Sequence, residues 1–243
     1  MADFVGIAFD LAFKYRNPAI ILADGVIGQM MEKVVLPEQR TRLTDEEVIA
    51  RCPWATTGRT HHRTPNIITS LELDPAEMEK RNIHLQKKYA EIEENEVRFE
   101  ELHCEDAEYL IVAFGSCARI AQKAMEIARE EGIKVGLLRP ITLWPFPSKA
   151  IAARAAQVKG ILTVELNAGQ MVEDVRLAVE CKVPVEHFGP SGWYCSDPDE
   201  VITALKRETN KIRPYEYRSD QKHIEHTFHG TGTSGCHHLL HGK

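Results

Sequence analysis

Between residues 107 and 209, short apolar runs alternate with segments whose apolar residues recur at helical spacing. The apolar runs end at turn residues, which is the pattern of buried strands followed by amphipathic helices. The expected strands are residues 109–114, 134–138, 160–166 and 183–188, and the expected helices are residues 117–131, 148–158, 170–180 and a helix that starts at Asp197. This order predicts an α/β fold, a mostly parallel sheet with helices on both faces.

The first 33 residues follow a different pattern. Residues 1–16 predict a helix with apolar side chains on more than one side, and therefore burial on more than one face. After an Asn-Pro pair, residues 19–23 form an apolar run that predicts a buried strand closed by Asp24 and Gly25. A lone strand of this type has no ladder partner nearby in sequence. We expect that it joins the later sheet or that the chain opens inside a domain.

A connector and a long helix are expected between these two regions. Across residues 32–73 prolines and polar residues interrupt the pattern, which predicts an irregular connector. His61-His62 lies there, and we favour a surface loop over a metal ligand, because neighbouring residues on a regular element cannot readily reach one metal. Asp74 then caps a helix that is expected to run to about residue 102. Its apolar seam is interrupted, which favours a solvated linker helix over a coiled coil.

Composition excludes several classes of function. The chain has 243 residues, a net charge of −6 and a pI near 6.0, which argues against nucleic acid or an anionic membrane as the main partner. Its six cysteines form no C-x-x-C pair, so we expect reduced thiols in a cytoplasmic protein and no iron–sulfur cluster on this chain. No apolar run approaches the roughly 20 residues of a membrane span.

Candidate chemistry lies where the expected third strand ends. Glu165, Asn167 and Gln170 follow this strand directly, and ligands or partners of open parallel sheets bind at the carboxyl ends of strands. The alternative for Glu165 and Asn167 is local capping of the following helix and turn. Both interpretations remain open at the level of sequence.

Two further segments carry weaker signals. Gly115-Ser116 precedes a helix, where free backbone N–H groups can bind an anion, although the full G-x-G-x-x-G motif is missing. Arg139 opens a proline-rich segment with Trp144, for which we favour structural or interface packing and keep a carboxylate or phosphate contact of Arg139 as the alternative. The chain has no Walker A motif, G-x-S-x-G elbow or H-E-x-x-H motif.

Residues 210–243 break the pattern again and predict a disordered tail rich in histidine. A transition-metal site is the alternative, although the spacing does not match closed tetrahedral sites. The candidate ligands of that weaker alternative are His223, His226, His229, Cys236, His237 and His241.

Three motifs together identify a family. They are ILADGVIGQMM at residues 21–31, IKVGLLRPITLWPFP at residues 133–147, and VELNAGQMVEDVR at residues 164–176. The combination closely resembles the alpha subunit of 2-oxoacid:ferredoxin oxidoreductases, above all the 2-oxoisovalerate or branched-chain type. The resemblance covers roughly residues 1–205, and the segment from Gly189 to Cys195 departs from it.

The resemblance implies a domain order. Residues 1–33 resemble the carboxyl-terminal fragment of a pyrimidine-type thiamine diphosphate domain, and residues 34–106 a connector and linker helix. Residues 107–209 resemble the carboxyl-terminal α/β domain of transketolases, and the His-rich tail lies outside the family. No stretch matches the family's Tyr-Pro-Ile-Thr-Pro motif, so we expect a chain that is shortened at its amino terminus and poorly soluble alone.

The resemblance also implies a function for a complex rather than for the isolated chain. We expect a subunit of a hetero-oligomer that oxidatively decarboxylates a 2-oxoacid with coenzyme A as acyl acceptor. Thiamine diphosphate, Mg and the iron–sulfur clusters would belong to the partners, which are beta, gamma and ferredoxin-like delta subunits, with ferredoxin as electron acceptor. We expect no catalytic residue here, and interface or cofactor-proximal roles for Asp24, Gly25, Gln29, Arg139, Glu165, Asn167 and Gln170. The alternative is a non-catalytic docking module of the same complex, with or without metal bound by the tail.

Overall fold

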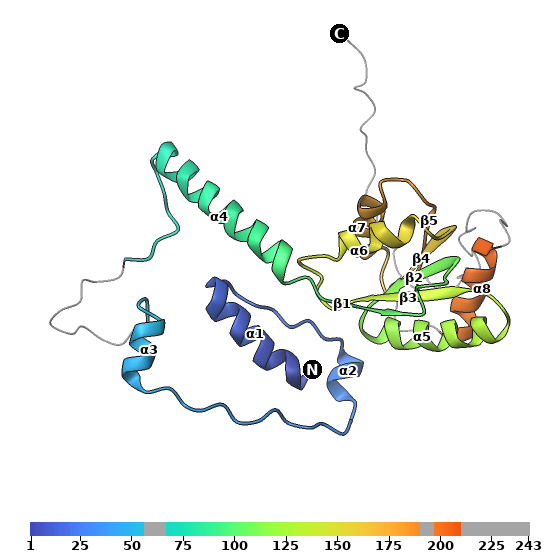
Figure 1. Ribbon diagram of the computed structural model, residues 1–243, viewed down its shortest axis with the longest axis horizontal. Helices are drawn as coiled ribbons and strands as arrows, with labels where there is room; N and C mark the ends of the chain where they lie inside the picture. The colour runs from blue at the N-terminus through green and yellow to red at the C-terminus, as the bar shows by residue number, and fades with distance from the viewer. Residues whose placement is uncertain (56–66, 190–196, 210–243) are drawn as a thin grey trace, which may run out of the picture.

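The computed structural model describes residues 1–55, 67–189 and 197–209 (Figure 1). Its carboxyl-terminal part is a sheet covered by helices. Its amino-terminal part consists of helices joined by extended chain, and no strand occurs among its described residues before Phe99. The two parts therefore differ in architecture, since only the carboxyl-terminal part of the described chain contains a sheet.

The sheet of the carboxyl-terminal part has five strands in the order β1-β3-β2-β4-β5. β2, β3, β4 and β5 run parallel, and β1 lies antiparallel to β3 at the edge. The strands are β1 (Phe99–Leu102), β2 (Tyr109–Ala113), β3 (Val135–Pro140), β4 (Gly160–Val164) and β5 (Val185–Phe188).

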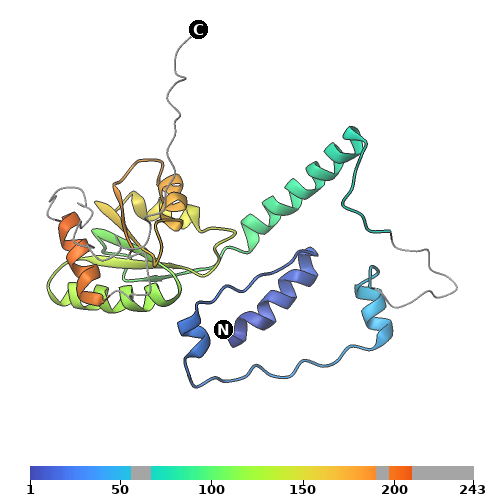
Figure 2. The same ribbon diagram turned by 180° about the vertical axis from the view of Figure 1, so that it is seen from behind.

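Two helices cover each face of the sheet (Figures 1 and 2). α5 (Gly115–Glu130) and α8 (Pro198–Thr209) form one core with Ile111 and Leu162 of the strands. α6 (Ser148–Ala155) and α7 (Met171–Val179) form the other core with Leu110 and Val112. Successive strand residues point to opposite faces, so neighbouring residues of β2 supply both cores. The predicted α/β fold with helices on both faces is confirmed.

β1 is a strand where a helix was predicted. α4 (Pro75–Asn95) starts at the Asp74 cap as expected, but it ends well before residue 102. Phe99–Leu102 then pairs with β3, so the sheet begins upstream of the expected boundary at residue 107. The two central glutamates of β1 find cationic partners in Arg139 of β3 and in Arg154 of α6. These tertiary pairings override a local composition that favours a helix.

The amino-terminal part contains α1 (Ala2–Tyr15), α2 (Gly25–Gln29) and α3 (Asp45–Arg51) besides α4. The predicted first helix is confirmed. The predicted strand at residues 19–23 is wrong, because these residues are extended but unpaired and exposed. The connector was expected to be irregular, yet it holds α3, which starts with a capping box between Thr44 and Glu47.

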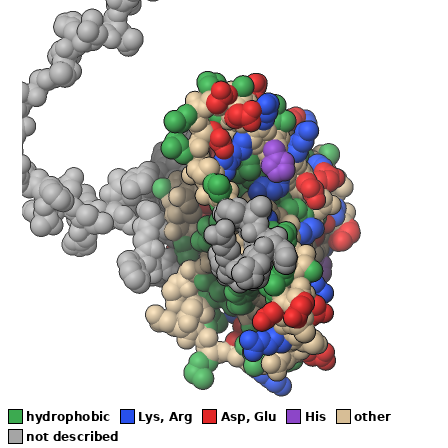
Figure 3. Space-filling view, turned by 90° about the vertical axis from the view of Figure 1, so that its left-hand side faces the viewer, with side chains coloured by type: hydrophobic (Ala, Val, Ile, Leu, Met, Phe, Trp, Pro, Cys, Tyr) green, Lys and Arg blue, Asp and Glu red, His purple; other side chains and the backbone are tan. Residues whose placement is uncertain are grey.

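The expected burial of α1 on more than one face is also wrong. Tyr15 is its one buried residue, while Phe9 and Phe13 of the outer side are 62% and 58% exposed. Phe4, Ile7 and Leu11 on the other side are half-buried. The apolar side chains on the outer side of α1 therefore remain largely uncovered by the described chain. When the molecule is viewed from the end formed by α3 and the start of α4, hydrophobic side chains likewise lie at the surface among charged ones (Figure 3).

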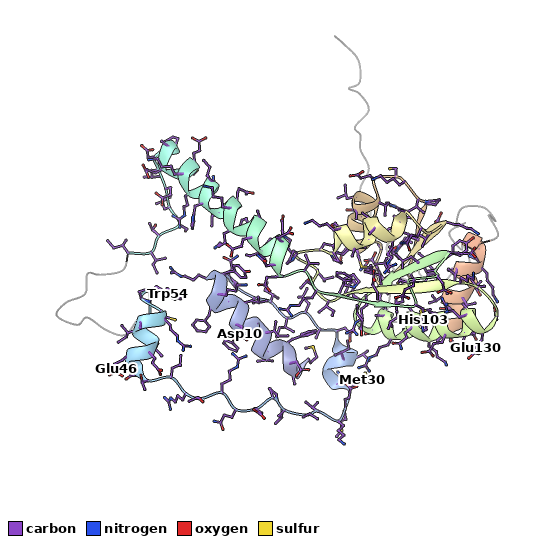
Figure 4. The ribbon with its side chains drawn as sticks, in the orientation of Figure 1. Asp10, Met30, Glu46, Trp54, His103 and Glu130 are labelled. Carbon is purple, nitrogen blue, oxygen red and sulfur yellow. The ribbon has the colours of Figure 1, made fainter. Side chains whose placement is uncertain are left out.

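Polar contacts hold α1 to the rest of the chain. The buried carboxylate of Glu96, just after α4, accepts hydrogen bonds from Tyr15 Oη and Lys14 Nζ, both at 2.7 Å. Arg98 Nη2 lies 3.4 Å from the other carboxylate oxygen. On the outer side, Arg40 Nη2 donates to Asp10 of α1 at 2.7 Å (Figure 4). The hydrogen bond from Lys14, and after it the bond from Tyr15 and the charge of Arg98, lower the pKa of Glu96, which favours its charged form.

Candidate functional site

The strand order places a topological switch point between β2 and β4. The chain leaves β2 for β3 on one side and then returns to β4 on the other, and open α/β sheets bind ligands at the carboxyl ends of such strands. Ala113 lies opposite Val164, so Gly115 and Glu165 follow neighbouring strand ends. Arg139 follows the residue of β3 that pairs with Val112. The structure thus brings three of the predicted segments to one edge of the sheet.

Glu165 is the centre of this edge, with a residue exposure of 1%. Its Oε2 accepts hydrogen bonds from the backbone N–H groups of Gln170 and Met171 at 3.2 and 2.8 Å, and its Oε1 accepts from Val172 N–H at 2.9 Å. These donors form the first turn of α7, where the helix dipole favours a negative charge. Capping, the alternative weighed from sequence, therefore describes the contacts of Glu165.

Asn167 belongs to the same cluster. Its Nδ2 donates to Glu165 Oε2 at 3.1 Å, and its Oδ1 accepts from the backbone N–H of Gly169 at 2.7 Å. Gly169 has a φ of +103°, which a side chain would strain, and the turn before α7 depends on it. Gln170 is exposed and makes no side-chain cap on α7. Of the three predicted residues, Glu165 is buried, Asn167 is half-buried and Gln170 is exposed.

β5 borders the Glu165 cluster on the side of β4 that faces away from β2. The Nε2 atom of His187 lies 3.2 Å from the carbonyl oxygen of Asn167, and its Nδ1 lies 3.6 Å from Glu165 Oε1. This Nδ1 is buried and has no hydrogen-bond partner. Gly189 follows, and a Cβ there would lie 2.4 Å from the backbone oxygen of Glu165. The chain is packed so closely here that a side chain at position 189 would clash with the backbone of Glu165 and Asn167.

Asp24 occupies the neighbouring strand end. Its Oδ1 accepts from the backbone N–H of Ile27 at 2.7 Å, which caps α2, and its Oδ2 accepts from the Ser116 hydroxyl at the start of α5. The Ile27 N–H and then the Ser116 hydroxyl lower the pKa of Asp24. The predicted anion position at Gly115-Ser116 thus faces an internal carboxylate. Gly25 and Gln29 are the first and last residues of α2, which packs on α5.

Arg139 is engaged in an ion pair rather than free. Its Nη1 donates to Glu100 Oε2 at 3.0 Å across the β1–β3 ladder. In the proline-rich segment that follows, Trp144 meets Tyr89 of α4 edge to face, with ring centroids 5.8 Å apart, and remains 55% exposed. This supports the packing interpretation of the segment.

A cavity of about 1350 Å³ lies between α1, the extended chain on either side of α2, and the edge of the sheet. Its lining is mainly apolar and includes Phe4, Leu11, Ile21, Val35, Leu137 and Trp144. Two ion pairs lie around it, the Arg139–Glu100 pair and the Arg119–Glu32 pair at 3.4 Å. The cavity therefore suits apolar protein surface better than a charged small molecule.

The described residues do not supply the donor set for a magnesium diphosphate. They contain no group of three or more His, Cys, Asp or Glu side chains placed to hold a metal ion. Glu165, the most buried carboxylate of the edge, has both oxygens bound to backbone N–H groups. The histidine candidates of the tail and the His61-His62 pair lie outside the described residues.

The described cysteines are Cys52, Cys104, Cys117 and Cys181, and none of these four forms a disulfide. Burial raises the pKa of Cys104 to about 11, so this thiol stays protonated and acts as a core residue. In the part of the chain that the structure describes, no helix has the length and apolar character to cross a membrane.

Sequence reasoning missed two sets of contacts. One is His187 beside Glu165, and the other is the pairing of Tyr15 and Lys14 with Glu96. A histidine within an expected strand and a glutamate within an expected helix carry no local signal of such partners, since both depend on segments distant in sequence. The sequence predicted Gly115-Ser116 as a possible anion site. It did not predict that the Ser116 hydroxyl binds Asp24, because the two residues lie far apart in the sequence.

Comparison with known proteins first assigns the class of the domain. Residues 107–201 match the sequence profile of the family described as pyruvate:ferredoxin oxidoreductase core domain II. A solved structure with a similar fold is 2-oxoglutarate:ferredoxin oxidoreductase from Magnetococcus marinus, with a TM-score of 0.50 and 24% identity. The similarity covers 56% of this chain and 24% of that one, and it shows the fold.

Two curated relatives then indicate the type of oxidoreductase subunit to which the chain is similar. Ketoisovalerate oxidoreductase subunit VorB of Methanothermobacter marburgensis is 47% identical over 182 residues, which are 75% of this chain and 50% of VorB. 2-Oxoglutarate synthase subunit KorA of Archaeoglobus fulgidus is 31% identical over 185 residues, which are 75% of this chain and 51% of KorA. The chain is thus related to subunits of 2-oxoacid oxidoreductases, and it spans about half the length of these relatives.

Proposed function

We propose that the chain is a component of a 2-oxoacid:ferredoxin oxidoreductase that acts on a branched-chain 2-oxoacid. The observation that carries this proposal is the difference between two similarities of equal extent. Identity is 47% with the ketoisovalerate oxidoreductase subunit and 31% with the 2-oxoglutarate synthase subunit, each over 75% of this chain. The branched-chain type is therefore favoured over the 2-oxoglutarate type.

In this proposal the chain is a subunit that the enzyme complex needs for turnover, and it is inactive alone. The carboxyl edge of its sheet is fixed by Glu165 and Asn167, whose polar atoms bind the α7 turn. Among the predicted edge residues, the carboxylates of Glu165 and Asp24 and the guanidinium of Arg139 all have internal partners. The partner subunits would supply thiamine diphosphate with Mg, iron–sulfur clusters that take electrons singly, and the site for coenzyme A.

A docking module without any role in catalysis is the second candidate. It is favoured by the apolar side chains that α1 and residues 19–36 expose, such as Phe9, Leu22 and Val35 at 62%, 72% and 82%. Contiguous exposed apolar surface of this kind marks protein interaction sites. Both candidates require partner subunits and differ only in whether the chain is needed for turnover.

Reconstitution separates the candidates. The full chain is mixed with the partner subunits, and ferredoxin reduction is followed with 2-oxoisovalerate and, in a parallel reaction, 2-oxoglutarate. We expect no reduction by the chain alone, and coenzyme A-dependent reduction in the mixture that is faster with 2-oxoisovalerate. Assembly without turnover, while the same partners are active with a full-length subunit, would leave only the docking module. Faster turnover of 2-oxoglutarate would contradict the substrate type.

Metal binding by the tail remains a separate proposal with a separate test. Metal content is measured in the full chain after incubation with zinc or nickel, and again after deletion of residues 220–243. Loss of bound metal on deletion is required by the proposal, and an unchanged metal content would refute it. The deletion leaves residues 1–209 intact, so ferredoxin reduction in the reconstituted mixture is expected to be unchanged.

A further inference from the structure

His187 holds an unsatisfied polar atom beside a buried carboxylate. Its Nδ1 is the one buried side-chain nitrogen or oxygen of the described residues that lacks a hydrogen-bond partner. Glu165 Oε1 lies 3.6 Å from this atom, just beyond hydrogen-bond distance, and the Glu165 side chain is fully buried. A buried polar atom without a partner is unfavourable and calls for a physical reason.

Both ring nitrogens of His187 face oxygen atoms that act as acceptors. Nε2 lies 3.2 Å from the backbone oxygen of Asn167, and Nδ1 faces Glu165 Oε1, which accepts from the backbone N–H of Val172. Neutral imidazole has one N–H and one lone pair, so each neutral tautomer points its lone pair at one of these oxygens. The imidazolium has two N–H groups and offers a donor to each oxygen. The geometry therefore fits the protonated ring better than either neutral form.

Close backbone contacts hold the ring in this position. A Cβ at Gly169 would lie 3.8 Å from both Cδ2 and Nε2 of His187, and a Cβ at Gly189 would lie 2.8 Å from its Cε1. These two glycines thus place bare backbone against the imidazole. The side chain is nevertheless 21% exposed, so the ring can exchange a proton with water. A histidine that is held in place and reached by solvent can respond to pH.

The charged groups around His187 come from β4 and α7. Like Val185, the ring lies on the face of β5 that α6 and α7 cover. The charged residues of α7 are exposed, and they are Glu173, Asp174 and Arg176. Glu186 of β5 points to the opposite face, where α8 packs with Phe188, so the sheet separates the ring from the charged α8 residues Asp199, Glu200, Lys206 and Arg207. Among the described carboxylates, that of Glu165 alone lies within ion-pair distance of the ring.

We propose that His187 is a proton-sensitive clamp on the turn between β4 and α7. As the imidazolium it donates from Nε2 to the Asn167 oxygen and from Nδ1 to Glu165, and loss of the Nδ1 proton to water releases Glu165 and loosens the turn. Gln170 lies in this turn and is exposed, so the clamp governs how firmly its side chain is held at the carboxyl edge. The inference goes beyond the proposed function and does not depend on it, since all its contacts lie within this chain.

The sign of the pH dependence follows from these partners. Both bonds need the second proton on the ring, so the clamp is closed at about pH 5.5 and open at about pH 8, on either side of the value near 6.5 at which histidine in a model peptide titrates. In the unfolded chain the ring has neither partner. Protonation therefore stabilises the folded chain, and His187 contributes more to stability at the lower pH.

Urea unfolding of the full chain at both pH values tests the clamp. The parent is compared with His187→Gln, whose amide can still donate to the Asn167 oxygen but does not titrate. Groups elsewhere titrate alike in both proteins, so their effects cancel in the ratio. Between about pH 8 and about pH 5.5, we expect the unfolding equilibrium constant of the parent to fall about tenfold relative to that of His187→Gln. His84→Gln is the matched control, because His84 is exposed on α4, and its ratio to the parent should stay within about twofold.

NMR of the ring nitrogens provides a second measurement that needs no variant. Long-range ¹H–¹⁵N spectra of the parent distinguish the imidazolium from the two neutral tautomers. The Cε1 proton of His187 lies against Gly189, so a nuclear Overhauser contact between them assigns the ring. We expect the imidazolium at about pH 5.5 and a neutral ring at about pH 8, with the amide shifts of Gly169 and Met171 following the same titration.

Several results would overturn the clamp. They are an equal pH dependence in the parent and His187→Gln, a ring that stays neutral at the lower pH or charged at the higher pH, and amide shifts of Gly169 and Met171 that do not follow the ring. A larger contribution of His187 at the higher pH would show that the neutral ring fits the site. None of these measurements needs a partner subunit or turnover, so a failed ferredoxin assay would count against the proposed function alone.

Discussion

The two parts of the molecule use their apolar residues in opposite ways. In the sheet and its helices, side chains such as Ile111, Leu162 and Val175 are 0–2% exposed. In the described chain before Asn95, the buried apolar residues are Tyr15 and Ile92 alone, and Phe9, Ile20 and Leu22 are more than 60% exposed. Apolar residues therefore form a closed core in one part and an exposed surface in the other.

The difference shows what a strand pattern needs in order to become a sheet. β2 pairs on both sides, with β3 and β4, and α5 and α6 follow closely enough to cover its two faces. Residues 19–23 carry an equally apolar run but have one helix, α1, before them and only the five-residue α2 after them. A strand is stabilised by neighbours rather than by its own propensity, so the same signal gives two outcomes.

Matched truncations in the two parts should show the largest contrast. Ile111→Ala should lower the free energy of unfolding of the sheet domain by about 3 kcal/mol, because it leaves a cavity between β2 and α5. Phe9→Ala should change it by less than about 0.5 kcal/mol, because the ring is 62% exposed. Urea unfolding of both variants measures the difference. Equal losses of unfolding free energy would mean that Phe9 contributes to a core as Ile111 does, which would contradict the contrast between the two parts.

Glu165→Gln tests whether the carboxyl edge is a structural device. The amide keeps the volume but turns one acceptor into a donor that faces the N–H of Met171 or Val172. Unfolding should become easier by about 2 kcal/mol. The control is Glu173→Gln, an exposed residue in the same first turn of α7, for which we expect less than about 0.5 kcal/mol. Equal effects in urea unfolding would show that Glu165 does not cap the helix.

Glu96→Gln tests the contact that joins the two parts. The side chain is 8% exposed, and loss of its charge weakens the bonds from Lys14 and Tyr15. We expect the amides of α1 to exchange about fivefold faster, while the sheet is unchanged, for a loss of about 1 kcal/mol. Glu94→Gln is the control, since Glu94 pairs with Lys149 at the exposed surface and should contribute nothing measurable. Unchanged exchange in α1 would show that other contacts hold this helix.

The smallest expected effect is the pH dependence of the contact between α2 and α5. The pKa of Asp24 is lowered by the Ile27 N–H and the Ser116 hydroxyl, so its stabilising effect is present above its ordinary pKa of about 3.9. It is lost as the pH falls through the lower value in the folded chain. NMR shifts of α2 amides should therefore move below about pH 4. Asp24→Asn keeps the cap but should abolish this titration, and a titration that persists would assign it to another group.

The fold of the sheet domain could be predicted from sequence because its signals are local. Apolar runs, turn residues and helical spacing recur within about 100 residues, and each predicts its own element. β1 could not be predicted, since its two glutamates become strand residues only through Arg139 and Arg154. The Thr44 capping box of α3 was present in the sequence, and attention to that signature would have found the helix.

The candidate site was predictable in position but not in contacts. Glu165 and Asn167 were located at a strand end, and the structure places Gly115 just after β2 and Arg139 near the end of the neighbouring β3. Their partners depend on how loops fold back, as when the first turn of α7 surrounds the Glu165 carboxylate. Sequence spacing alone could not decide between a ligand contact and a cap. The interface or cofactor-proximal role of the seven candidate residues stays a prediction.

Amide hydrogen exchange of the isolated full chain tests the central claim that the sheet domain has a closed core whereas residues 19–23 are exposed and unpaired. The account predicts that amides of β2 and β4 exchange only through global unfolding, while those of residues 19–23 exchange within about tenfold of the unprotected rate. Protection of residues 19–23 as strong as that of β2 in the isolated chain would contradict it.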